Sequence, residues 1–250
     1  LIVCGSCYAC RQGDSHICKN LKLIGIDCDG GFAQYCLIPE ENLVRLPEGM
    51  NLKLAALAEP AAVCLHAIRS SVFKTGDNVM VFGAGPIGLV AAICLKAAGA
   101  ADIIVVEKEE KRIFFAKSLG FETVCDLEDF KENDSRIIDV IFETSGAQAL
   151  LPYTVDLVKI KGFISIVGKF DEPALFNLHD VLFKEITVKG SRVYRNGEFK
   201  QAVVLIHKNA EFFEKLVTDI YGLNDINAAI DDFKKRKNLC KIMIDNSRGI

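Results

Sequence analysis

The stretch that decides the fold reads VMVFGAGPIG and occupies residues 79–88. Its apolar first half is typical of a buried β-strand, and apolar residues recur at helical spacing from Pro86 onward. A strand, a tight turn and a helix thus follow one another, with the glycines in the G-x-G-x-x-G register. Gly83 permits the sharp turn, Gly85 leaves room for a pyrophosphate to approach the backbone, and Gly88 lets the helix pack closely on the strand. The free N–H groups and the positive dipole at the start of the helix would then bind phosphate.

The glycine pattern alone is a weak signal, because a strand-to-helix turn without a ligand can also carry it. A second apolar run at residues 103–106 follows the helix, however, and ends in the acid Glu107. A dinucleotide-binding fold places a carboxylate at that point, where it accepts hydrogen bonds from the adenosine ribose. Such an acid also repels a 2′-phosphate. The sequence therefore predicts that the chain binds NAD in preference to NADP.

Four cysteines lie close together near the start of the chain. Two residues separate Cys4 from Cys7 and Cys7 from Cys10, and Cys18 follows after seven more. Four thiolates can close a tetrahedron around Zn²⁺ with no open position, which is typical of a structural site. An iron–sulfur centre and a redox pair are the alternatives, but the gaps differ from ferredoxin spacings and a redox C-x-x-C needs only two thiols. Since four thiolates fill the coordination shell, we expect His16 in the same loop to be a surface histidine.

Length, charge and hydropathy limit the size of the domains and the kinds of partner that the chain can have. The chain has 250 residues, half of them hydrophobic, which suits one large domain or two modest ones. A net charge of −3 and the absence of a long basic run argue against nucleic acid as the main partner. No apolar stretch is long enough to span a membrane, and no signal peptide is visible. We therefore expect neither a nucleic acid nor a membrane as partner.

The other cysteines lie mostly within apolar runs, where a buried free thiol is the usual state. They are Cys28, Cys36, Cys64, Cys94, Cys125 and Cys240. A reduced, cytoplasmic setting fits this usage better than a secreted disulfide scaffold.

Strands and helices alternate through the middle of the chain. The predicted strands cover residues 79–83, 103–106, 123–125, 139–143, 163–168 and 185–190. The crossover at residues 126–138 is short and polar, so we expect an abbreviated helix there. This alternation predicts an α/β fold with a doubly wound parallel sheet. We expect the strand at 185–190 to lie at an exposed edge, where it could pair with a second copy of the chain.

The two ends of the chain are predicted to form a second domain. Residues 21–46 alternate apolar residues with turn signals and predict a small β region. We expect the tail, with a predicted strand at 240–244, to return to that region and complete it. The predicted boundaries give one domain from residues 1–61 and 197–250, and a dinucleotide-binding domain from residues 62–196.

Glu59 has two interpretations. It stands just before Pro60, which is well placed to be the first residue of a helix, so an acid at a positive helix end is the simple interpretation. The alternative is a carboxylate aimed into a cleft beside the dinucleotide-binding domain. The local sequence does not decide between them.

Several motifs together resemble the zinc-dependent medium-chain alcohol dehydrogenases, and most of all the branch of sorbitol, threonine and 2,3-butanediol dehydrogenases. The likeness covers essentially all 250 residues. The motifs are the four cysteines, DGGFAQY at 29–35, EPAAV at 59–63 followed by HA at 66–67, VFGAGPIGL at 81–89 and KEITVKG at 184–190.

The resemblance implies a GroES-like catalytic domain, built from both chain ends, packed on a Rossmann domain. It implies the reversible oxidation of a secondary alcohol to a ketone, in which a catalytic Zn²⁺ activates the alcohol and NAD accepts the hydride. It also implies a homodimer or homotetramer that forms through the edge at residues 185–190.

Individual roles follow from the same resemblance. Glu59 matches the acid beside the catalytic zinc, either as a ligand or as the group that holds its water, and Tyr194 matches a substrate-side tyrosine of the polyol branch. An arginine precedes that tyrosine in the polyol branch, whereas Val193 stands here, which puts polyol-type hydroxyl contacts in doubt. The cofactor-binding positions are Gly83, Gly85, Pro86, Ile87, Gly88, Glu107, Arg112, Val167 and Gly168.

The chain opens on the residues Leu1-Ile2-Val3-Cys4, which are typical of the end of a strand. The family's first catalytic zinc ligands, a cysteine and the histidine and acid of a G-H-E motif, would lie upstream of them. We therefore expect the chain to lack the N-terminal part of the catalytic domain of a dehydrogenase. The alternatives are a non-catalytic NAD-binding or scaffold protein that keeps only the structural zinc, and an iron–sulfur electron carrier fused to a nucleotide-binding fold.

Overall fold

The computed structural model describes residues 1–235 and 239–247. The chain forms two compact units, one from Leu1–Ala62 with Val193–Ile250 and the other from Val63–Arg192. The predicted boundaries were placed at 61/62 and 196/197. That the two units serve as a catalytic and a dinucleotide-binding domain stays a prediction.

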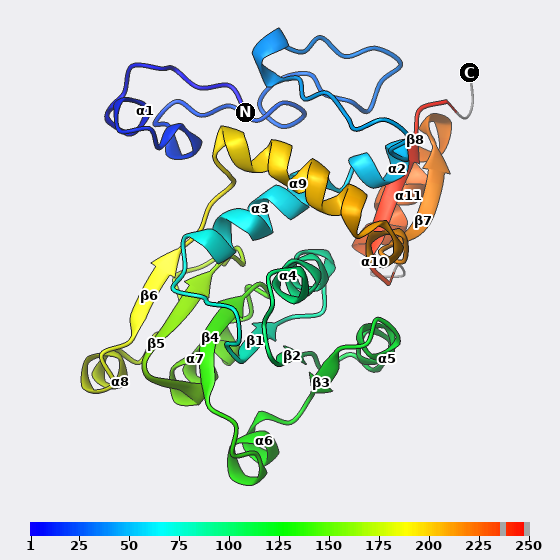
Figure 1. Cartoon of the computed structure of the whole chain (residues 1–250). Coiled ribbons are helices and arrows are strands. Elements are labelled where there is room, and N and C mark those ends of the chain that lie inside the picture. The colour runs from blue at the N-terminus through cyan, green and yellow to red at the C-terminus, as the bar shows by residue number, and fades with distance from the viewer. Residues whose placement is uncertain (236–238, 248–250) are drawn as a thin grey trace. The chain divides into compact units, whose positions relative to one another are not determined.

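The unit Val63–Arg192 is built on a six-stranded sheet in the order β3-β2-β1-β4-β5-β6 (Figure 1). Every neighbouring pair of these strands is parallel. The strands are β1 Val79–Phe82, β2 Ile103–Val106, β3 Glu122–Val124, β4 Ile138–Glu143, β5 Val158–Ile166 and β6 Thr187–Gly190. The strand order reverses between β1 and β4, which makes this the switch point of a Rossmann-type sheet. The predicted α/β fold is confirmed, although β5 begins well before the predicted residue 163.

Helices cover both faces of this sheet. They are α4 Pro86–Ala97, α5 Glu110–Ser118, α6 Leu127–Asn133, η3 Gln148–Leu150, α7 Leu151–Leu157 and α8 Leu178–Phe183. Met80 and Phe82 of β1 pack into a cluster with residues of α6 and α7, and Val79 and Val81, which alternate with them along the strand, are equally buried. A strand buried on both faces needs an unbroken apolar run, and this explains the pattern at the start of the deciding stretch. The crossover helix α6 is short, as predicted, and Asp126 caps it by accepting hydrogen bonds from the N–H groups of residues 128 and 129.

Strand β6 lies at the edge of the sheet, as predicted, and all four of its residues are exposed. Helix α8, which precedes β6 in the chain, also has exposed apolar side chains, among them Leu178, Leu182 and Phe183. No helix within residues 1–235 and 239–247 has the length and apolar character needed to cross a membrane.

The unit formed by the two chain ends contains helices, a two-stranded sheet and long irregular segments within its described residues. Its elements are α1 Tyr8–Arg11, η1 Ser15–Ile17, η2 Glu40–Asn42, α2 Leu52–Ala55, α9 Asn196–Lys208, α10 Ala210–Glu214, β7 Val217–Gly222, η4 Leu223–Asp225, α11 Ile226–Lys234 and β8 Lys241–Asp245. Helix α3, Ala58–Arg69, contributes residues to both units.

The predicted β region at residues 21–46 is wrong for the described structure. That segment contains no strand, only the short helix η2 and isolated bridges between Ile2 and Lys22 and between Ile24 and Cys28. The apolar alternation fails because the described residues offer no opposing strand to bury it: Tyr35 is 91% exposed.

The terminal strand β8 exists, but it pairs in parallel with β7, a strand that the sequence analysis missed. Just beyond β8, the Asn246 side chain donates hydrogen bonds to the carbonyls of Gly31 and Ala33, at 2.8 and 3.0 Å. The tail thus returns to the predicted segment through a side chain and not through a sheet.

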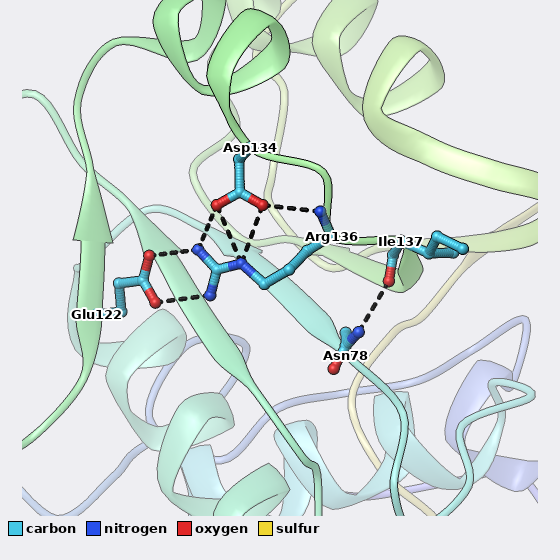
Figure 2. Close-up of polar contacts among 5 residues, drawn as sticks. All are labelled: Asn78, Glu122, Asp134, Arg136 and Ile137. Carbon is cyan, nitrogen blue, oxygen red and sulfur yellow. Dashed lines mark hydrogen bonds and ion pairs between the residues drawn. The ribbon is translucent and has the colours of Figure 1, made fainter.

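An ion-pair network links β3 to the segment that leads into β4 (Figure 2). The Arg136 guanidinium donates two hydrogen bonds to the Glu122 carboxylate, at 2.5 and 2.7 Å, and also binds Asp134 at 2.6 Å. Beside it, the Asn78 side chain donates to the Ile137 carbonyl at 3.0 Å. The hydrogen bonds from Arg136 hold the pKa values of Glu122 and Asp134 below their ordinary values.

We predict that Arg136→Gln lowers the free energy of unfolding by about 0.5–1 kcal/mol at pH 7, the usual size for a partly exposed pair. Both carboxyl pKa values are lowered in the folded state, so this stabilisation is complete above the ordinary carboxyl pKa and disappears as pH falls through the folded-state values. The unfolding free energies of wild type and variant, measured in urea, should therefore begin to converge as the pH falls below about 4. Lys169→Gln, which breaks an almost fully exposed pair with Asp171, serves as the control and should change nothing. A constant difference between pH 3 and pH 7 would contradict this account.

Candidate cofactor and metal sites

The glycine turn joins β1 to α4 through backbone geometry that side chains would prevent. Gly83 has φ +102°, a conformation that favours glycine. A Cβ atom on Gly88 would lie 1.8 Å from the Gly83 carbonyl oxygen, so no larger residue fits there. A Cβ atom on Gly85 would meet nothing within 4 Å. The space over Gly85 is therefore open to a ligand, and Pro86 begins α4 immediately beside it.

Glu107 lies at the carboxyl end of β2 and reaches this turn. Its Oε2 accepts a hydrogen bond from the N–H of Ala84 at 3.1 Å, and its Oε1 accepts from the N–H groups of Lys108 and Glu109. The carboxylate is thus fixed between the glycine turn and the start of α5. Arg112 on α5 pairs with Glu109 at 3.5 Å.

The remaining predicted cofactor residues lie near the turn or near a residue that the sequence analysis did not assign. The Ile87 carbonyl accepts a hydrogen bond from the Cys64 thiol at 3.4 Å. Val167 and Gly168 follow β5, and both donate their N–H groups to the carbonyl of Glu143 at 2.8 Å. The Glu143 side chain is fully buried at the end of β4. The sequence could have indicated Glu143 as a site residue, because an acid ends the apolar run of β4 just as Glu107 ends the apolar run of β2.

The four cysteines of the N-terminal loop converge. Their sulfur atoms all lie within 4.8 Å of one another, with 3.5 Å between Cys18 and Cys4. Backbone hydrogen bonds from Ser6 and Cys7 lower the pKa of Cys4 to about 6, whereas burial is the main cause that raises the pKa of Cys10 to about 12. Four sulfur donors at these separations fit a tetrahedral soft metal ion. Among the described residues, they form the one group of three or more potential metal ligands.

Other expectations for the cysteines and this loop are partly wrong. His16 is buried, with 6% of its surface exposed, and is therefore not the surface histidine that the sequence predicts. Cys64, Cys94 and Cys240 are buried and not in a disulfide, as predicted. Cys28, Cys36 and Cys125 are exposed, since the segments that carry them lie on the surface.

Glu59 and Tyr194 lie in the same unit. Helix α3 begins at Ala58, so Glu59 is inside its first turn and Pro60 is not the first helical residue. Glu59 itself is solvent-exposed, yet partial desolvation raises its pKa while the positive charge of Lys241 opposes the rise. Tyr194 is 8% exposed, and burial, followed by the negative charge of Glu59, raises its pKa to about 12.

Hollows of different size open on the described residues of this unit. A small one of about 80 Å³ is lined in part by Tyr194, Asn196 and Phe199. A larger one of about 600 Å³ lies over residues 24–35 and includes none of the predicted site residues. Within the described part of the chain, Glu59 does not belong to a group of three or more potential metal ligands.

Comparison with known proteins places these features in a family. Residues 1–48 match the alcohol dehydrogenase GroES-like domain, and residues 86–208 match the zinc-binding dehydrogenase family. The (R,R)-butanediol dehydrogenase of Bacillus subtilis is 35% identical over 243 residues, which are 94% of this chain and 70% of that enzyme. Sorbitol dehydrogenase of Halalkalibacterium halodurans is 34% identical over 241 residues, 93% of this chain and 70% of that enzyme.

A solved structure agrees with these matches. The crystal structure of an alcohol dehydrogenase from Escherichia coli CFT073, complexed with NADH, superposes with a TM-score of 0.88 at 26% identity, over 96% of this chain and 73% of that one. The chain belongs to the zinc-type medium-chain alcohol dehydrogenases, a family of oxidoreductases.

Proposed function

We propose that this protein transfers a hydride between a secondary alcohol and NAD. The contact between Glu107 and the glycine turn carries the proposal, because it places an acid beside the open backbone at Gly85. Polyols, 2,3-butanediol and threonine-like alcohols are the candidate substrates, by analogy with the relatives described above. Val193 in place of the polyol-branch arginine favours an alcohol with fewer hydroxyl contacts.

Residues at the carboxyl ends of the parallel strands would each bind a different part of the cofactor. The N–H groups at the start of α4 and the open space over Gly85 would receive the pyrophosphate. Glu107 would accept hydrogen bonds from the adenosine ribose and disfavour a 2′-phosphate, with Arg112 nearby on α5. Val167 and Gly168, beyond β5, would flank the nicotinamide.

We assign two roles to zinc in this proposal. Cys4, Cys7, Cys10 and Cys18 would hold a closed, structural zinc ion, since their sulfur atoms have already converged. A catalytic zinc ion, when bound, acts as a Lewis acid that lowers the pKa of the alcohol. Glu59 would supply a carboxylate beside that ion and Tyr194 would face the substrate. The described residues around Glu59 do not form a set of three or more metal ligands.

NADH binding is the decisive test of the proposed function. Wild-type protein should enhance NADH fluorescence and gain thermal stability in the presence of NADH. Glu107→Gln should weaken NADH binding about tenfold, or about 1.4 kcal/mol. The same variant should reduce the ratio of NADH affinity to NADPH affinity, because a neutral amide no longer repels the 2′-phosphate. Gly85→Ala should fold normally, since its Cβ atom meets nothing, but should weaken NADH binding because the methyl group occupies the open space.

Two matched variants control this test. Glu110→Gln removes an exposed acid at the start of α5, and Gly197→Ala adds a methyl group at another open glycine. Both should bind NADH like the wild type. If wild-type protein shows neither a fluorescence change nor a stability gain with millimolar NADH, the proposed function is wrong.

The structural zinc site makes a separate prediction. Cys10→Ser should remove one zinc ion per chain in elemental analysis and should lower the melting temperature by roughly 5–10 °C, at about 2–4 °C per kcal/mol for a chain of this length. The physical reason is that the loop loses the ion that closes it. Cys125→Ser, at an exposed free thiol, should change neither quantity. Iron in place of zinc, or an unchanged zinc content in Cys10→Ser, would rule out this site.

We further propose that β6 forms the contact of a homodimer or homotetramer. Ser191 donates its N–H to the Ile166 carbonyl of β5, so the alternation of a strand turns the N–H of Val188 outward, away from β5. Val188→Pro should therefore yield a monomer of 27.5 kDa in light scattering while NADH binding persists. Phe114→Lys removes an exposed apolar side chain from α5 and should leave the mass unchanged. A wild-type protein that is already monomeric would refute the proposal.

The cytoplasmic location stays a proposal as well. None of the ten cysteines forms a disulfide in the structure, which suits a reducing compartment. Recovery of the protein from a secreted or membrane fraction of the source cell would contradict it.

A further inference from the structure

Glu143 is a buried carboxylate for which the proposed reaction has so far given no role. It ends β4, has 0% of its surface exposed, and lies in register between Phe82 of β1 and Ile166 of β5. It therefore sits beside the switch point of the sheet, where ligands of open α/β sheets bind. A buried charge is costly unless hydrogen bonds compensate it, so its partners indicate what it does.

All side-chain hydrogen bonds of Glu143 go to the turn that follows it. Oε1 accepts from the N–H of Ser145 at 2.8 Å, from the Ser145 hydroxyl at 2.5 Å and from the N–H of Gly146 at 3.0 Å. Burial raises the pKa of Glu143, and the hydrogen bonds from Ser145 and Gly146 oppose that rise because they favour the charged form. The carboxylate thus fixes the turn at residues 144–146.

The same residue also fixes the segment that follows β5. Its main-chain carbonyl accepts the N–H groups of Val167 and Gly168, each at 2.8 Å. A Cβ atom on Gly168 would lie 2.5 Å from Glu143 Oε2, and one on Gly146 would lie 2.3 Å from the Lys169 carbonyl oxygen. The two segments therefore touch each other around the Glu143 side chain without room for further atoms.

Residues 144–146, the turn after β4, also pack against the glycine turn after β1. The Thr144 hydroxyl donates to the Phe82 carbonyl at 2.8 Å. A Cβ atom on Gly83 would lie 3.1 Å from Ser145 Cβ, and one on Gly88 would lie 2.8 Å from Thr144 Oγ1. Glu143 itself therefore binds the segments that follow β4 and β5, whereas Thr144 and Ser145 make the contacts with the glycine turn after β1.

We propose that Glu143 is a positioning residue for the nicotinamide half of the dinucleotide, acting through residues 144–146 and 167–169. The proposal rests on the NAD binding proposed above. Glu107 lies on the β2 side of the switch point and serves the adenosine half, whereas the segments held by Glu143 lie on the β4 and β5 side. Loss of the Glu143 charge should therefore affect one half of the cofactor and spare the other.

The experiment compares NADH with ADP, which contains the adenosine and the pyrophosphate but no nicotinamide. Glu143→Gln keeps the shape of the side chain but replaces a charged acceptor with a neutral one. We expect it to raise the NADH dissociation constant about tenfold, the loss of about 1.4 kcal/mol that a weakened charge-assisted hydrogen bond can produce. The ADP dissociation constant, measured by calorimetry, should stay within about twofold of the wild type.

A control variant separates positioning from stability alone. Asp134→Asn also removes a carboxylate that binds a backbone N–H in the same unit, but it lies in the segment leading into the start of β4. It should lower the melting temperature and leave the NADH-to-ADP ratio of affinities unchanged. If Glu143→Gln does not fold, Ser145→Ala takes its place: it removes one donor to the carboxylate and should raise the NADH dissociation constant about threefold with ADP unaffected.

The outcomes distinguish this inference from the proposed function. If the wild type binds neither NADH nor ADP, the proposed function fails and the inference fails with it. If the wild type binds both, and Glu143→Gln or its substitute weakens both equally or neither, Glu143 only supports the fold and this inference alone is overturned. A selective loss of NADH affinity supports it.

Discussion

The glycine turn between β1 and α4 depends on one close approach, that of Gly88 to the carbonyl of Gly83. An added Cβ atom at Gly88 would lie 1.8 Å from that oxygen, far inside any van der Waals contact. Because the first turn of α4 can lie against the end of β1, the helix N-terminus and the space over Gly85 face the same edge of the sheet. The phosphate site proposed here exists only while that packing holds.

Two acids, each at the carboxyl end of a strand, have different roles at this end of the sheet. Glu107 ends β2 and stays partly accessible, so it can bind the glycine turn and still accept hydrogen bonds from a ligand. Glu143 ends β4, is fully buried, and directs its hydrogen bonds to the protein's own turn. The same sequence signal therefore gives a ligand-binding group on one side of the switch point and an internal support on the other, because burial decides which partners a carboxylate can reach.

The unit formed by the chain ends is stabilised differently from the sheet. The N-terminal loop holds its shape around four sulfur atoms, and Cys18 alone among them is buried. Apolar residues nearby, such as Tyr35 and Leu37, stay exposed. A small region with little buried apolar surface commonly relies on a bound metal ion for its stability, which fits four thiols that already converge.

The sequence by itself determined the central sheet, its parallel strands, the glycine turn, the exposed edge at β6 and the cysteine cluster. These features depend on local periodicity, on glycine geometry and on short spacings, all of which are visible along the chain. The prediction from sequence failed where the outcome depended on distant partners. Residues 21–46 show the alternation of strands but meet no opposing strand in the described structure. Strand β7 was missed, and β8 pairs with β7. Only the tertiary structure showed that His16 and Glu143 are buried and that Glu107 reaches Ala84. The reason is physical, since burial and hydrogen-bond partners are properties of segments brought together from far apart in the chain.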